Sequence, residues 1–331
     1  MKFGGSADAP PTSHRLQRSR WRSGPGRNIN CQMNHATRLL LGTALIAVCW
    51  AGVSTGSDLS GQPGPPAHTL RVVSMNPSLT QMLIALEALQ VLVGVDAYSA
   101  VHEPAVAALP RVGGLFNPSL EAVIALEPDL VVVVPSLQQR DFRSRLRELG
   151  VEVLELGSLT LDQILESMQT LGDRVGRSQA ARKHVAAIHS TWIDVVREAS
   201  LRPRRSAVLV LQRDPLYVVG GGSYLNSMLD AAGLDNAAVE YSEAYPRVSL
   251  EWLIAVGPQV IIDSSDDPVS AIEHWSRWAS IPAVAESRVV AVPQGLVTLP
   301  GPYLGRSLRT MVAAIRSIDE ASDAAEGARP Q

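Results

Sequence analysis

The chain has 331 residues, a formal net charge of −3 and 46% hydrophobic residues, a composition typical of a globular protein long enough for two domains. Acidic and basic residues are interspersed along it, so no basic surface is predicted and we expect no nucleic-acid partner. The only cysteines are Cys31 and Cys49, which excludes disulfides and thiolate metal sites from everything after Cys49.

The N-terminal region differs in composition from the rest of the chain. Residues 1–32 are rich in Arg, Gly, Ser and Pro and show no periodic apolar face, so we interpret them as a disordered extension or a mis-assigned start. If the start is mis-assigned, Met33 is the expected true start. Residues 57–68 are rich in Gly and Pro and are predicted to form a flexible leader to the folded part.

The segment 33–56 has the pattern of a signal peptide, which predicts a periplasmic location. Arg38 precedes an apolar run from Leu39 to Val53, which is shorter than the roughly 20 residues that span a bilayer, and small residues follow it. An uncleaved membrane anchor is the alternative. Lipoprotein anchoring through Cys49 is disfavoured, because the bulky Val48 stands where a small residue is needed.

From residue 69 onward, short β-branched runs alternate with helical patterns, which predicts βαβ units and parallel sheets. The first helix begins near Pro77 or Ser78. In residues 69–175, an N-terminal α/β lobe, strands are predicted at 70–74, 91–96, 129–134 and 151–156, and helices at 76–89, 118–128 and 141–150.

A long helical stretch from Leu161 to Leu201 follows, with a break predicted near Gly176. Its second half, from Ser178, has no internal Gly or Pro, so residues 176–203 are predicted to be one long rigid helix that joins two lobes. Strands and helices then alternate again. The C-terminal α/β lobe covers 204–318, with strands expected at 206–212, 216–219, 259–264 and 288–293 and helices from Ser223, at 247–258 and at 303–318; residues 319–331 are expected to be a disordered tail.

Two stretches of the chain nearly repeat each other: "NPSLEAVIALEPDLVVVV" and "RVSLEWLIAVGPQVIIDS". Aligned on Glu121 and Glu251, they share Ser, Leu, Glu, Ile, Ala and Pro. Ser119 and Ser249 are good helix N-caps, and a glutamate in the first turn interacts favourably with the helix dipole. Capping alone explains the Ser and the Glu, whereas common ancestry of the two lobes also explains the residues that follow them.

No catalytic or metal motif stands out in the folded part. "GGGSY", from Gly220 to Tyr224, lacks the Lys and spacing of a phosphate loop and is interpreted as a turn with a helix N-cap. The histidines form no H-E-x-x-H pattern, so no metal site is predicted. Aromatic residues instead follow the predicted strands, where open α/β folds bind ligands, and they indicate a ligand crevice: Tyr98, Phe116, Tyr217 and Tyr245.

Five segments, in order through both halves, carry a resemblance to a known family: "RVVSMNPSLTQMLIAL", "VGVDAYS", "RVGGLFNPSLEAVIALEPDLVVV", "DPLYVVGGGSYLNSMLDAAGLDN" and "YPRVSLEWLIAVGPQVII". Between about Leu70 and Ile318 the chain resembles the helical-backbone (class III) periplasmic substrate-binding proteins, which serve ABC importers of vitamin B12, ferric siderophores or heme. The resemblance implies a bilobed fold, a ligand between the lobes and no resident cofactor, the ligand itself being a metal chelate such as cobalamin or a ferric siderophore. It also implies a monomer that delivers this ligand to an ABC permease dimer with its ATPase subunits.

Residue roles follow from the same resemblance. The family carries one surface glutamate in each lobe that contacts permease arginines, and Glu121 and Glu251 match those positions. The vitamin B12-binding members hold the corrin between aromatic side chains, and Tyr98, Tyr217 and Tyr245 fall at matching positions. Pro77 and Phe116 complete the set of candidate ligand contacts. The family places a tryptophan before the first Ser-Leu-Glu helix, and Leu115 takes that position here.

Ligand identity stays open at this point. The segment 293–305, where the family places charged contacts of the second lobe, has no charge, which favours vitamin B12 or a related corrinoid. A ferric siderophore or heme is the alternative within the family. A two-domain α/β enzyme is the alternative from another class, and a scaffold with an empty cleft is a third.

Overall fold

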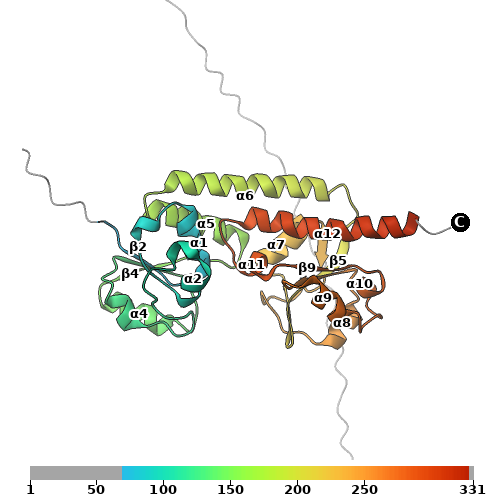
Figure 1. The fold of residues 1–331 in the computed structure, drawn as a ribbon, viewed down its shortest axis with the longest axis horizontal. Coiled ribbons are helices and arrows are strands. Elements are labelled where there is room, and N and C mark those ends of the chain that lie inside the picture. The colour runs from blue at the N-terminus through green and yellow to red at the C-terminus, as the bar shows by residue number, and fades with distance from the viewer. Residues whose placement is uncertain (1–68, 328–331) are drawn as a thin grey trace, which may run out of the picture. The chain divides into compact units, whose positions relative to one another are not determined.

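The computed structural model describes residues 69–327. The predictions for the extension, the signal peptide, Cys49 and the leader lie outside this part of the chain. No helix within the described range is both long and apolar enough to cross a membrane. The described part contains two β-sheets with helices packed around them (Figure 1).

The N-terminal lobe is built on the first sheet, which has the strand order β2-β1-β3-β4 with every pairing parallel. Every residue of β1 and β3 is buried, as expected for parallel strands covered on both faces. In chain order its elements are β1 (Val72–Ser74), α1 (Pro77–Ala85), η1 (Leu89–Val91), β2 (Leu92–Val95), α2 (Ala97–His102), η2 (Pro104–Val106), α3 (Leu120–Ile124), β3 (Leu130–Val133), α4 (Arg140–Glu148) and β4 (Glu152–Glu155).

The C-terminal lobe is built on the second sheet, with the order β6-β5-β8-β9 and with β7 also paired to β5. Its elements are β5 (Arg205–Arg213), β6 (Leu216–Val218), α7 (Tyr224–Ala231), β7 (Leu234–Asn236), α8 (Leu250–Val256), β8 (Val260–Ser264), α9 (Pro268–Trp275), α10 (Pro282–Ala285), β9 (Val289–Val292), α11 (Gln294–Thr298) and α12 (Leu304–Gly327). The expected parallel arrangement holds except for β6, which is antiparallel to β5. Only a short turn at Asp214 and Pro215 separates these strands, and so short a connection permits only a hairpin.

The predicted bridging helix is present. Helix α5 (Leu161–Arg174) ends before Gly176, whose φ of 69° is left-handed, and α6 (Ser178–Ala199) begins after it. Helix α6 contacts α5 of the first lobe and α7 and α12 of the second, and α12 lies alongside it in Figure 1. The fold is therefore that of two α/β lobes joined by one long helix, as the sequence predicts.

One apolar core connects the two lobes through this helix. Its inner face carries Ala181, Ile188 and Val195, which recur at every second turn and belong to the same cluster of buried residues as Leu83 of α1 and Leu229 of α7. Two smaller clusters lie on the far faces of the two sheets. Because α6 is packed against both lobes, it acts as part of a continuous core and not as an exposed linker.

Helix α12 is longer than predicted. It continues to Gly327, whereas the sequence predicts a disordered tail from residue 319. Between Ile318 and Gly327 the chain consists of Asp, Glu, Ala and Ser, with no Gly or Pro to interrupt the helix.

Candidate functional site

Two adjoining cavities lie at the carboxyl ends of the parallel strands, and residues of both lobes line each of them. The larger has a volume of about 770 Å³ and the smaller about 480 Å³. Thr298 lines both cavities, and Pro77 of the larger is flanked in sequence by Asn76 and Ser78 of the smaller. We refer to the two cavities together as the cleft.

The cleft includes three of the five predicted ligand contacts. Pro77 and Tyr98 line the larger cavity, and Tyr245 lines the smaller. Neither cavity is lined by Phe116, whose side chain is 77% exposed, or by Tyr217. Tyr217 lies within strand β6, as the strand predicted at 216–219 implies, and not on a strand-to-helix loop with the other aromatic residues, because the hairpin places the residues after Asp214 in the sheet.

A buried polar network fixes the loops that carry the first-lobe contacts. The Asp96 carboxylate accepts hydrogen bonds from the backbone N–H groups of Tyr98 (3.0 Å) and Ser99 (2.9 Å) and thereby caps α2. The Ser99 hydroxyl bonds Thr80 Oγ1 at 3.1 Å, which bonds Ser74 Oγ at 2.8 Å. The network therefore connects the end of β1 to the first turn of α2, so Tyr98 is presented from a rigid base.

Helix α1 is capped in the same manner. Asn76 Oδ1 accepts a hydrogen bond from the Ser78 N–H at 2.9 Å, and Pro77 occupies the first helical position. The predicted helix start near Pro77 or Ser78 is confirmed. This cap places Pro77 at the edge of the larger cavity.

The larger cavity also contains charged and ionisable side chains that no sequence pattern indicated. His102 stacks on Tyr98 with ring centroids 4.1 Å apart, and the Arg306 guanidinium lies 5.3 Å from the centroid of the Tyr303 ring. Asp266 also lines this cavity and accepts a hydrogen bond from the Gln294 N–H at 3.1 Å.

The segment 293–305 has no charged residue and by itself suggests an uncharged cleft. The structure shows that the cleft does contain charged side chains. Arg306 follows that segment directly, in the first turn of α12, and only the folded chain shows that it lines the same cavity as His102. The sequence signal that could have found it is the spacing of Tyr303 and Arg306, which places an aromatic ring and a cation on one helical face.

Tyr224 anchors the segment that forms the second-lobe side of the cleft. Its buried hydroxyl donates a hydrogen bond to the Val297 carbonyl, and burial raises the pKa of this phenol above its ordinary value. Its backbone N–H donates to the Leu159 carbonyl of the first lobe at 2.7 Å. Tyr224 is thus a neutral structural anchor between the lobes.

The two predicted docking glutamates lie at equivalent places in the lobes. Ser119 Oγ accepts from the Ala122 N–H at 3.1 Å and caps α3, and Ser249 Oγ accepts from the Trp252 N–H at 3.2 Å and caps α8. The predicted capping is confirmed. Glu121 and Glu251 are both exposed in the first turn of their helices.

The charge of Glu251 is stabilised locally. Its pKa is held below the ordinary value first by a hydrogen bond from its own backbone N–H and then by one from the Ser249 hydroxyl. The carboxylate is therefore both a capping group and an exposed anion available to a partner's cation.

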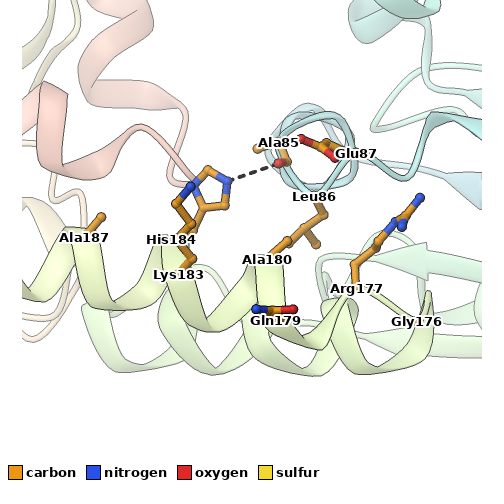
Figure 2. Close-up of a pocket in the computed structure, with 10 residues that line it drawn as sticks. All are labelled: Ala85, Leu86, Glu87, Gly176, Arg177, Gln179, Ala180, Lys183, His184 and Ala187. Atoms are coloured by element: carbon orange, nitrogen blue, oxygen red, sulfur yellow. Dashed lines mark hydrogen bonds between the residues drawn. The ribbon is translucent and has the colours of Figure 1, made fainter.

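A third cavity lies away from the strand ends. It has a volume of about 550 Å³ and is formed between the end of α1 and the first half of α6 (Figure 2). His184 Nε2 donates to the Ala85 carbonyl at 3.1 Å there, and Glu87, Arg177 and Lys183 line the rim. It shares no residue with the cleft, and His184 holds α6 against the first lobe.

Within residues 69–327, no group of three or more His, Cys, Asp or Glu side chains is arranged to hold a metal ion. The cleft offers stacking faces, amides and single charged groups. Such a lining suits the binding of an organic small molecule more than that of a bare metal ion.

Two α/β lobes on one long helix, with cavities lined by both lobes at the strand ends, define a bilobed ligand-binding protein. Residues 72–296 match the family model described as periplasmic binding protein, and the chain belongs to this family. The resemblance noted from the sequence is confirmed.

Individual relatives are distant but cover most of the chain. An uncharacterized ABC transporter substrate-binding lipoprotein of Bacillus subtilis, YvrC, is 27% identical over 74% of this chain and 79% of its own. The vitamin B12-binding protein of Vibrio cholerae is 25% identical over 72% of this chain and 86% of its own. The periplasmic heme-binding protein RhuT from Roseiflexus, solved in apo form, superimposes with a TM-score of 0.65 at 22% identity, covering 76% of this chain and 99% of its own.

Proposed function

We propose that the protein is the substrate-binding component of an ABC importer and that it captures vitamin B12 or a related corrinoid in the cleft. The observation that carries the proposal is the larger cavity, which residues of both lobes line at the strand ends. Family membership supports the binding role, and the vitamin B12-binding protein of Vibrio cholerae supports the choice of ligand.

A large planar ligand fits the shape and lining of the cleft. The larger cavity, at about 770 Å³, is near the upper end of the range of small-molecule sites, roughly 300–1,000 Å³. Tyr98, Tyr245 and Tyr303 line the cleft, and their rings supply flat apolar surface with a polar tip. We propose that the corrin ring stacks on Tyr98 and Tyr303 and that Tyr245 contacts a group attached to the ring.

Heme is the second candidate ligand. Tyr98, His102 and Tyr303 line one cavity, and imidazole and phenolate groups are both known axial ligands of heme iron. The heme-binding relative from Roseiflexus supports this alternative at the level of the fold. A ferric siderophore would use Arg306 for its anionic groups.

Direct titration separates these ligands. Purified protein is titrated with cyanocobalamin, hemin and a ferric hydroxamate siderophore, and saturable binding is followed by tyrosine and tryptophan fluorescence. Saturation by cyanocobalamin alone is expected; saturation by hemin alone would transfer the proposal to heme. No response to any of the three would overturn it in favour of an empty scaffold or an enzyme.

We further propose that Glu121 and Glu251 contact arginines of the permease dimer. Both carboxylates are exposed, and the same Ser-Leu-Glu cap presents each of them. The protein would act as an exported monomer that offers one anionic contact from each lobe.

A further inference from the structure

Among the described residues, Arg306 is the one arginine that lines the larger cavity, and its surroundings differ from those of its neighbours on α12. Arg309 lies 3.5 Å from Asp194 of α6, and Arg316 forms an ion pair with Glu198. Within residues 69–327, Arg306 forms no ion pair, and its guanidinium carbon lies over the Tyr303 ring, 5.3 Å from the ring centroid. The side chain is exposed to the cavity.

Because no ion pair within the described residues uses the Arg306 guanidinium, its N–H groups are available to a ligand. They form a fork that matches a carboxylate or a phosphate. Asp266, the one carboxylate that lines this cavity in the described part of the chain, accepts instead from the Gln294 N–H at 3.1 Å. From the other lobe, His102 adds an imidazole N–H donor.

We propose that Arg306 binds an anionic group of the ligand, a carboxylate or a phosphate, and thereby determines which ligands the cleft accepts. The proposal rests on the binding role given above. The ligand is then a planar chelate with an anionic substituent that extends toward the first turn of α12. A corrinoid would supply the phosphodiester of its nucleotide arm, and a heme would supply a propionate.

Matched ligand pairs test this assignment and distinguish the two sources of charge. Cyanocobalamin is compared with dicyanocobinamide, which has the corrin ring without the phosphodiester, and hemin with hemin dimethyl ester. In Arg306→Gln, the Kd for the anion-bearing member of the pair that binds should rise about tenfold or more. The Kd for its partner without the anion should change less than about twofold, and Arg306→Lys should restore part of the loss.

Arg309→Gln is the matched control, because it removes an arginine on the next turn of the same helix whose partners lie on α6. It should leave both members of each pair unaffected. An equal loss for both members in Arg306→Gln, or no loss for either, would overturn the assignment while leaving the binding role intact. If the wild-type protein binds neither pair, the proposed function fails and this inference fails with it.

Discussion

The two lobes repeat one parallel framework and differ in what is added to its strand ends. Strand order β2-β1-β3-β4 in the first lobe corresponds to β7-β5-β8-β9 in the second, and in each the Ser-Leu-Glu helix leads into the third strand of that order. Between residues 69 and 327, strand β6 has no counterpart in the first lobe, and α2, with Tyr98 and His102, has none in the second. The repeated parts thus present the proposed docking glutamates, and the unrepeated helix α2 contributes Tyr98 and His102 to the lining of the cleft.

Removing both glutamates should give the largest effect. We expect Glu121→Ala with Glu251→Ala to abolish uptake of labelled cyanocobalamin by cells or proteoliposomes that carry the cognate importer, while the Kd for the ligand is unchanged. The physical reason is that each carboxylate is exposed and lines neither cavity of the cleft. Each single variant should retain part of the transport, because one contact remains.

Two other exposed glutamates, one in each lobe, give a matched control: Glu148→Ala with Glu273→Ala. This pair removes the same charge from α4 and α9 and should transport normally. Transport equal to wild type in the Glu121 and Glu251 double variant would contradict the proposed docking role of these two residues. Loss of ligand binding in that variant would also contradict this role.

Substitutions of two aromatic residues test whether the ligand binds in the cleft and not along the shared framework of the sheets. Tyr98→Ala removes a ring that lines the larger cavity, and it should weaken ligand binding about tenfold or more, measured by fluorescence titration. Tyr217→Ala removes a ring of β6 that lines neither cavity, and it should change the Kd less than about twofold. An equal loss in both would show that the ligand extends beyond the cleft toward β6.

The framework was predictable from the sequence because local signals agree there. The β-branched runs, the Ser caps at Ser119 and Ser249 and the break at Gly176 each act through neighbours in the chain, and each is found where expected. The cleft was predictable only in part. Arg306 and Asp266 are far apart in sequence and line the same cavity only through tertiary packing, which a linear pattern does not contain.

Substitutions in the turns that follow the two Ser-Leu-Glu helices should have a smaller effect, on the stability of the protein. Aligned on the glutamates, Glu127 and Gly257 occupy the same position after the Ser-Leu-Glu helix, and both are left-handed, with φ of 44° and 57°. Gly257→Ala should destabilise the protein by about 1 kcal/mol, because a side chain disfavours this conformation. An added Cβ would lie 3.6 Å from Pro282, an ordinary contact, so the cost is conformational.

Glu127→Gly should have the opposite effect on the free energy of unfolding. It relieves the same conformation in the first lobe and should raise the free energy of unfolding by up to about 1 kcal/mol. Urea denaturation of the two variants measures both changes. Destabilisation by Glu127→Gly would mean that the glutamate side chain contributes more than its backbone strain costs, and the two turns would then not be equivalent.

The smallest predicted effect concerns the charge of Glu251. Its own backbone N–H and, secondly, the Ser249 hydroxyl hold its pKa below the ordinary value, so Ser249→Ala should raise that pKa without fully restoring it. A depressed folded-state pKa contributes stability that is complete above the ordinary glutamate pKa, about 4.3, and is lost as pH falls through the folded value. Ser249→Ala should therefore reduce the acid dependence of stability in this range.

NMR titration of the Glu251 carboxylate measures the change in its pKa. Ser119→Ala, which alters the cap of the other lobe, should leave the Glu251 pKa unchanged. An unchanged Glu251 pKa in Ser249→Ala would mean that the backbone alone keeps this carboxylate ionised, and the hydroxyl would then serve only as the cap of α8.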